Sequence, residues 1–352
     1  MKHILFLLLF FVVIGCNNNE SYMNDLTKVD FANTDIVHLK EDTLKIKMEI
    51  TGNIYIKDSI LLMYSTRYNN YLLHVLNINN GEKLTSLLPI GKSQSEYLKN
   101  TRIYFDSHNI SESEWGIWIF DRTKNQFRLI NIPQSITNNT TVIDSIVKFN
   151  NEKKGLIYGF GKIYYSNNLV YARMQELQNG EEKVCQPVKY YKCIVDNELK
   201  VGDEILIYNK GISREEHIHA LASRDIFSKN KNKIAMAMEF LPQLNIIDLS
   251  SEYVKGLYYK DYTSFETVLQ NREHDLWYNI SITSNDDYIY VLTTEGFEGE
   301  YPIFGNMIYV FDWNGNPISR IKTPSFLRTI IVDKNTLYGQ DNDYNCYKYN
   351  LN

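Results

Sequence analysis

The stretch that decides the fold class is Met307-Ile308-Tyr309-Val310-Phe311-Asp312-Trp313-Asn314-Gly315-Asn316-Pro317-Ile318-Ser319-Arg320-Ile321. Apolar and aromatic residues fill its first five positions, as in a buried strand. Asp312 and Gly315 then give a tight polar turn, and an alternating strand follows. Pro317 is tolerated at the start of a strand, where no ladder donor is needed yet. The stretch therefore predicts a β-hairpin whose aspartate accepts backbone N–H groups in the turn.

The same unit recurs along the chain. Phe120-Asp121 and Ile247-Asp248 also end a strand before a polar turn, and further strands are indicated at 54–56, 60–64, 72–78, 83–84, 103–105, 233–238 and 288–292. Repeats of ~40–50 residues with few helix signals are typical of a β-propeller. We expect an all-β, single-domain propeller, most simply six-bladed, with seven blades and a β-sandwich array as the alternatives. Ser95–Leu98 suggest a single turn of helix, and a capping box at Ser213 suggests a short helix over 213–222.

The first residues read as a leader. Lys2 precedes an apolar run from Ile4 to Ile14, which is shorter than the ~20 residues that span a bilayer. Val13-Ile14-Gly15-Cys16 resembles the lipobox of bacterial lipoproteins. The resemblance implies cleavage after residue 15 and a lipid on Cys16; an ordinary secretory signal is the alternative.

The predicted leader and lipid site divide the chain into three parts. We expect a signal peptide over 1–15, a lipidated N-terminus and flexible tether over 16–34, and the propeller over 35–352. Asn17 stands where some lipoproteins carry an aspartate that retains them at the inner membrane. The expected location is therefore the outer membrane, on its periplasmic or cell-surface side, with the lipid on Cys16 as the contact to the bilayer.

Net charge and cysteine content bear on nucleic-acid binding and on disulfide bonds. The 352 residues carry a formal net charge of −5, which gives no electrostatic basis for binding nucleic acid. Besides Cys16, the chain has Cys185, Cys193 and Cys346. A bridge between Cys185 and Cys193 and buried free thiols are both open.

Several motifs fall short of a catalytic or metal site. Gly91-Lys92-Ser93 lacks the first glycine of a phosphate loop, because position 86 is serine. His217 and His219 would share a metal only in an extended segment, which the capping box disfavours. Asp341–Asn345 begins like a calcium loop but lacks its glycine, so a hairpin turn is expected. We therefore predict no catalytic residues, no metal and no cofactor.

Aromatic residues are the compositional anomaly, at 13% of the chain. Trp115, Trp277 and the pair Tyr258-Tyr259 lie near expected loops and could stack on sugars, although packing between blades is favoured for each. Glu295–Tyr301 is expected to form a loop between two strands and to serve as a mobile rim.

Four segments together carry a family resemblance: Leu88–Tyr97, Ser228–Ala237, Ile308–Ile321 and Ile331–Tyr338. They resemble the six-bladed, TolB-like β-propeller lipoproteins of Gram-negative bacteria, whose members are mostly uncharacterised. The resemblance covers most of the chain, with a poor match over 140–222. It implies that a strand within 36–50 pairs with the last strands, around 346–351, and closes the ring.

Two functions fit these observations. The leading hypothesis is a lipid-anchored binding or scaffold module that recognises a protein or a glycan. The alternative is a propeller enzyme, a hydrolase or lyase, that acts on extracellular polysaccharide. It requires carboxylates or histidines with shifted pKa values at the mouth of the channel.

Overall fold

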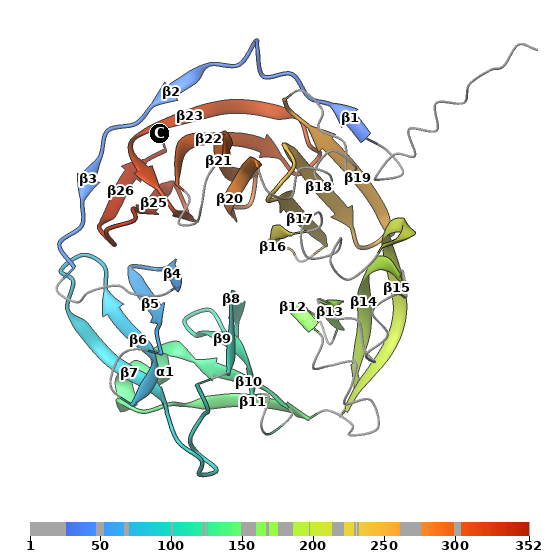
Figure 1. The fold of residues 1–352 in the computed structure, drawn as a ribbon. Coiled ribbons are helices and arrows are strands. Elements are labelled where there is room, and N and C mark those ends of the chain that lie inside the picture. Colours follow the sequence, from blue (N-terminus) through green and yellow to red (C-terminus); the bar gives the residue numbers. More distant parts are fainter. Residues whose placement is uncertain are drawn as a thin grey trace, which may run out of the picture.

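The chain forms a ring of β-sheets around a central channel (Figure 1). The computed structural model describes residues 26–46, 53–66, 70–99, 101–121, 124, 126–148, 160–166, 169–174, 186–196, 198–212, 222–228, 230, 232–260, 276–298 and 304–351. Within these ranges the strands make five hydrogen-bonded sheets, one of which has eight strands. The eight-stranded sheet consists of two antiparallel units of four, so the ring contains six blades, as predicted.

The blades follow one another along the chain, each starting at its innermost strand (Figure 1). Blade 1 has β4 (Asn53–Lys57), β5 (Ile60–Tyr64), β6 (Tyr71–Asn77) and β7 (Lys83–Pro89). Blade 2 has β8 (Arg102–Asn109), β9 (Trp115–Asp121), β10 (Gln126–Asn131) and β11 (Ile143–Lys148). Blade 3 has β12 (Phe160–Ser166), β13 (Leu169–Met174), β14 (Gln186–Asp196) and β15 (Glu198–Ile212).

The second half repeats the plan. Blade 4 has β16 (Ser223–Phe227), β17 (Lys233–Met238), β18 (Gln243–Asp248) and β19 (Tyr253–Tyr258). Blade 5 has β20 (Leu276–Ser284), β21 (Tyr288–Glu298), β22 (Gly305–Asp312) and β23 (Pro317–Leu327). Blade 6 has β24 (Thr329–Asp333), β25 (Thr336–Gln340), β26 (Cys346–Asn350) and, from the other end of the chain, β3 (Asp42–Thr43).

The recurring aspartates do what the sequence predicts. Asp312 accepts the N–H groups of Asn314 and Asn316, both at 2.8 Å. Asp248 accepts those of Ser250 and Ser251 at 2.9 and 3.0 Å. Asp121 and Asp341 cap their own turns in the same way. Each capped turn brings two strands together, so the local chemistry sets the hairpins of the blades.

The core lies between neighbouring blades. Leu73 of blade 1 and Ile119 of blade 2 belong to one buried cluster, and Ala235 of blade 4 and Ile289 of blade 5 belong to another. Because both faces of a blade meet a neighbour, its central strands are apolar on both sides, as β9 is.

Residues 26–46, which we call the strap, run along the outside of blades 4, 5 and 6 (Figure 1). Its strands β1 (Leu26–Lys28) and β2 (Ile36–His38) pair in parallel with β19 and β23. Its third strand, β3, pairs antiparallel with β26, which confirms the ring closure implied by the family resemblance. The strap also differs from the sequence-based boundary: residues 26–34 of the expected tether pack on blades 4 and 5, where Val29 and Phe31 are buried.

Outer strands of the remaining blades are covered differently. Lys148 of β11 pairs in parallel with Glu198 of β15, which joins blades 2 and 3. A short helix, α1 (Ile132–Asn138), and the residues after it lie against β7. There the Leu88 N–H donates to the Thr141 hydroxyl oxygen (2.9 Å), and the Thr85 hydroxyl donates to Asn139 (2.8 Å). Covering outer strands in this way protects a sheet from edge-to-edge aggregation.

Two other sequence expectations meet the structure at this level. Glu295–Glu298 of the expected loop Glu295–Tyr301 continue strand β21 instead, because β20 is long enough to pair with them as far as Leu276. The helix expected over 213–222 and the Cys185–Cys193 pair lie outside the described residues. In the described part of the chain, no helix has the length and apolar character needed to cross a membrane.

Candidate functional site

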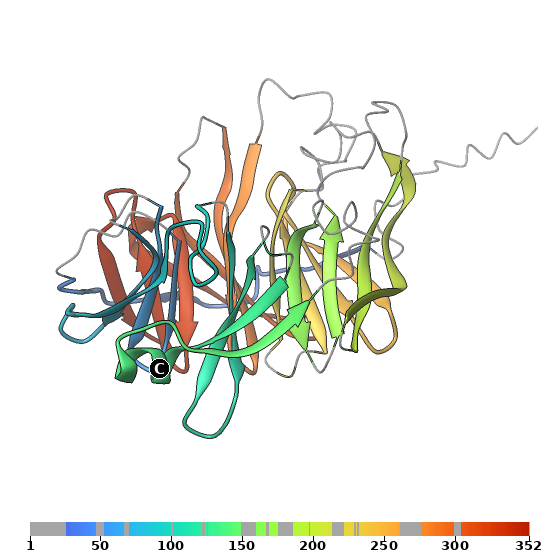
Figure 2. The same ribbon diagram turned by 90° about the horizontal axis from the view of Figure 1, so that it is seen from below.

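The two faces of the ring are built differently. Every inner strand begins on one face, the top face, which is uppermost in Figure 2. The connections between blades and the turns between second and third strands also lie there, and the tips of β20 and β21 stand above it (Figure 2). The opposite, bottom face carries tight hairpins, α1 and the C-terminus (Figure 2). Longer connections are where propellers place their recognition residues, so the top face is the candidate.

A compact loop at the top of blade 1 is its best-defined feature. We call residues 90–97 the knob. Ile90 and Tyr97 form a bridge, and the Gly91 N–H donates to the Tyr97 carbonyl at 3.0 Å. The Glu96 carboxylate accepts the Ser93 N–H at 2.8 Å and lies where a Cβ on Gly91 would be. These hydrogen bonds hold the knob in one conformation, with its tip of Lys92, Ser93, Gln94 and Ser95 exposed.

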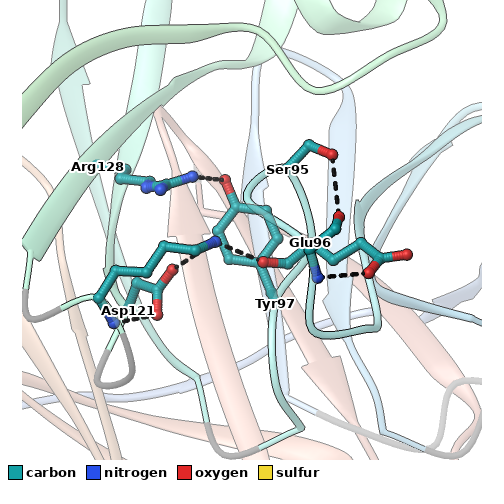
Figure 3. A network of polar contacts seen from close by, with 7 residues as sticks. Ser95, Glu96, Tyr97, Asp121 and Arg128 are labelled. Atoms are coloured by element: carbon teal, nitrogen blue, oxygen red, sulfur yellow. Dashed lines mark hydrogen bonds and ion pairs between the residues drawn. The ribbon is translucent and has the colours of Figure 1, made fainter.

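A polar network fastens the knob to blade 2 (Figure 3). Tyr97 is 1% exposed, and Arg128 of β10 donates from Nη1 to its hydroxyl at 3.0 Å. On the same ring lies Lys124, whose Nζ donates to the Glu96 carbonyl at 2.6 Å and is 3.2 Å from Asp121 Oδ2. The Arg128 guanidinium is itself 5.2 Å from the ring centre, so Tyr97 receives two cation–π contacts.

The electrostatics of this network suit positioning. Burial raises the pKa of Tyr97, so its phenol stays protonated and bonded to Arg128 at neutral pH. Hydrogen bonds from Ser93 lower the pKa of Glu96, which keeps its carboxylate charged and the knob closed. A buried arginine held by a phenol and stacked on its ring fixes geometry at the cost of desolvation. The arrangement therefore presents a rigid, exposed polar tip.

A second group lies across the ring, at the top between blades 4 and 5. Arg224 of β16 donates from Nε to Glu239 at 2.9 Å, and the Tyr278 N–H donates to the Glu239 carbonyl at 2.8 Å. The next residue, Phe240, packs on Trp277 with ring centres 4.6 Å apart. These contacts join the two blades at the channel mouth.

The aromatic residues singled out in the sequence divide. Trp115 is buried beside Tyr55, and Lys57 lies over its ring at 5.1 Å. Tyr259 is buried between blades 4 and 5, where its hydroxyl donates to Asn279. Packing between blades, the favoured alternative, therefore accounts for both. Trp277 is half-buried at the top face, where its ring packs on Phe240.

The other residues singled out in the sequence lie apart from one another. Gly91 belongs to the knob, whereas Asp341–Asn345 forms the expected hairpin turn of blade 6. Cys346 is a buried free thiol, and burial raises its pKa to about 12. Cys16, His217 and His219 lie outside the described residues. Across the described ranges, no three histidine, cysteine or carboxylate side chains gather as metal ligands would.

Two described groups with shifted pKa values lie within blade 1 and at the bottom face. His74 is buried in blade 1, where desolvation lowers its pKa to about 4 and its Nδ1 lies 2.9 Å from the Ser86 hydroxyl. Asp333, whose pKa burial raises, sits in a bottom turn and accepts the Asp58 N–H at 3.1 Å.

The sequence could have pointed to part of the knob. Gly91 and Glu96 belong to the segment Leu88–Tyr97 that carries the family resemblance, but Arg128 and Lys124 come from another blade. Their contacts with Tyr97 depend on how blades 1 and 2 pack, which no local pattern encodes.

Comparisons with known proteins bear on the fold. Neither a family model nor a curated protein sequence matches the chain. Among solved structures, a member of the DUF4221 family from Bacteroides vulgatus is 10% identical, covers 90% of this chain and 97% of its own, and has a TM-score of 0.56. A protein of Bacteroides fragilis, designated as exported, is 9% identical with coverages of 92% and 98% and a TM-score of 0.52. At these identities the likeness supports the β-propeller fold and no function.

Proposed function

We propose that this protein is a lipid-anchored, extracytoplasmic binding or scaffold module that recognises a protein partner through the top face of its propeller. The observation that carries the proposal is the knob: a rigid loop with an exposed polar tip, fixed from beneath by Tyr97 and Arg128. Pre-ordering a loop lowers the entropy lost on binding. Because the buried Arg128 holds this surface loop in one conformation, the loop is suited to recognition.

The extracytoplasmic location has two supports. Residues 1–16 resemble the signal peptide and lipobox of bacterial lipoproteins, and four segments of the propeller resemble the TolB-like lipoprotein family. In addition, the Bacteroides fragilis protein with the same fold is designated as exported. We propose the outer membrane as its site, with the lipid on Cys16 as the anchor.

A protein partner is favoured over a glycan by the chemistry of the knob. Sugar sites rely on aromatic rings that stack on the pyranose, and two of the candidate rings, Trp115 and Tyr259, are buried in the core. The tip carries hydroxyl, amide and ammonium groups instead. These are adaptable hydrogen-bonding groups of the kind that protein interfaces use.

Membrane fractionation tests the anchor. Cys16→Ala should move the protein from the membrane to the soluble fraction and abolish its labelling by an alkynyl fatty acid. Labelling that persists in Cys16→Ala would refute the lipid site.

Site-specific crosslinking in cells tests the recognition face. A photoreactive amino acid replaces Gln94 at the tip of the knob or, as the control, Asn80 in an exposed bottom-face turn. We expect a discrete crosslinked partner at position 94 and none at position 80. Crosslinks of equal yield at both positions, or none at either in membrane-bound protein, would contradict the proposal.

A further inference from the structure

An exposed apolar group stands on the top of blade 5. We call Leu276, Phe304 and Phe326 the crest. Leu276 begins β20, Phe304 precedes β22 and Phe326 lies near the end of β23, so all three are at the top face. Their exposed fractions are 38%, 42% and 55%. Large apolar side chains this exposed on the same face of one blade mark a contact surface.

The two phenylalanines touch each other. Their rings meet edge to face, with centres 5.8 Å apart. Among the ring pairs in the described part of the chain, this is the only one whose members are both classed as exposed. Elsewhere, as in Phe31 with Phe311 or Phe240 with Trp277, at least one ring is buried. Both rings of this pair are therefore exposed to solvent.

The proposed anchor lies nearby. The strap pairs with β19 from Leu26 onward, so nine residues, 17–25, separate it from Cys16. Ten extended peptide units span at most about 35 Å. The strap enters on blade 4, next to blade 5, with Leu26 beside Gly256 within β19, and it reaches the top of that strand at Lys28, beside Tyr258. A bilayer that held the lipid would therefore lie within reach of the crest.

We propose that the crest rests on the lipid bilayer that holds the acyl chains of Cys16, with Phe304, Phe326 and Leu276 inserted among the lipid headgroups. This inference rests on the proposed lipid anchor. It orients the ring: the top of blade 5 meets the membrane, and the knob lies on the other side of the channel (Figure 1).

The contact is apolar rather than electrostatic. Residues near the crest in sequence include Glu295, Glu298 and Glu300, against Lys322 and Arg328. This balance gives no attraction to anionic lipids, so burial of the aromatic rings must supply the contact. The association is accordingly expected to be insensitive to salt.

Fluorescence quenching in vesicles tests the inference. Full-length acylated protein carries Phe326→Trp or, as the control, Tyr253→Trp, which replaces an exposed aromatic at the bottom of blade 4. The vesicles contain phosphatidylcholine and phosphatidylethanolamine, with or without bromine on the acyl chains. We expect the added emission at position 326 to fall by about half or more in brominated vesicles, at low and high salt, as for a ring buried ~5–10 Å deep. The emission at position 253 should not change.

Flotation of the vesicles, measured first, separates the two proposals. Wild-type protein that fails to float with vesicles, or Cys16→Ala that floats equally well, overturns the anchor. Protein that floats through Cys16 but shows no quenching at position 326, or equal quenching at both positions, overturns the crest contact alone. A thermal unfolding curve for each variant confirms that it is folded.

Discussion

At the scale of single residues, Gly91 decides whether the knob can form. A Cβ on this residue would lie 2.1 Å from the Glu96 carboxylate carbon, so alanine must displace that side chain from the Ser93 N–H. We expect Gly91→Ala to speed amide exchange at Ser93 while changing global stability by less than about 1 kcal/mol, since the loop is at the surface. Glu96→Ala should have the same effect. Unchanged exchange in both variants would contradict this account of the knob.

Two turn aspartates should respond to pH with opposite signs. Burial raises the pKa of Asp333, so its ionisation on going from acid to neutral pH opposes folding. Hydrogen bonds within its turn, that from Ser250 above all, lower the pKa of Asp248 to about 2, so its ionisation favours folding, and this stability is lost as the pH falls through about 2.

Asn substitutions measure both signs. We expect Asp333→Asn to gain stability relative to wild type as the pH rises from 3 to 7, because the amide keeps an acceptor for the Asp58 N–H. Asp248→Asn should lose stability over the same range. Urea unfolding at both pH values gives the comparison, and shifts of the same sign in the two variants would refute it.

Residue chemistry that is local in sequence could be predicted. The aspartate turns at 121, 248, 312 and 341 were readable because donor and acceptor lie within four residues of each other. Arg128 and Tyr97 lie 31 residues apart, on different blades, and their contact could not be read. The sequence alone gave Arg128 no role at all.

At the scale of elements, the strap packs at three successive interfaces between blades. Phe31 lies between blades 4 and 5, with ring centres 4.8 Å from Tyr309 and 5.1 Å from Phe311. Glu41 lies between blades 5 and 6, where it accepts hydrogen bonds from Ser325 and Tyr349 at 3.0 and 2.7 Å. Leu44 packs on the cluster shared by blades 6 and 1. The strap thus stabilises half of the interfaces of the ring.

Truncating Phe31 tests this role. Phe31→Ala should lower the free energy of unfolding by about 3 kcal/mol, because it opens a cavity among buried aromatic rings. Ile36→Ala, in the exposed strand β2, is the control and should cost less than about 0.5 kcal/mol. Chemical denaturation of the two variants is the measurement. Equal, small effects would mean that the strap does not contribute to the core.

Elements differed in how far they could be foreseen. The central strands alternate or run apolar, and their prediction is confirmed. The strap strands have three residues or fewer, too short for any periodicity to show. Helix α1 had its signals, Asn131 as the N-cap and Pro133 in the first turn, but seven residues inside a strand-rich region did not stand out.

At the scale of the whole molecule, the two faces divide the work. The bottom face closes the ring: Lys334 of blade 6 bonds Asp58 of blade 1 at 2.8 Å, and the Asp333 carboxylate accepts the Asp58 N–H. The top face carries the knob over blades 1 and 2 and the crest over blade 5. In our proposal one holds a partner and the other meets the membrane, on opposite sides of one channel (Figure 1).

The strap closes the ring and leaves nine residues, 17–25, between its first strand and Cys16. Two amides report the position of the strap: the Val29 N–H donates to the Tyr258 carbonyl of blade 4, and the Leu44 N–H, which reports the closure itself, donates to the Cys346 carbonyl of blade 6, both at 2.8 Å. Hydrogen exchange of the full-length protein, resolved at these two amides, is the measurement. The account predicts exchange at least about a hundredfold slower than in an unstructured chain. Exchange at the unstructured rate would contradict it.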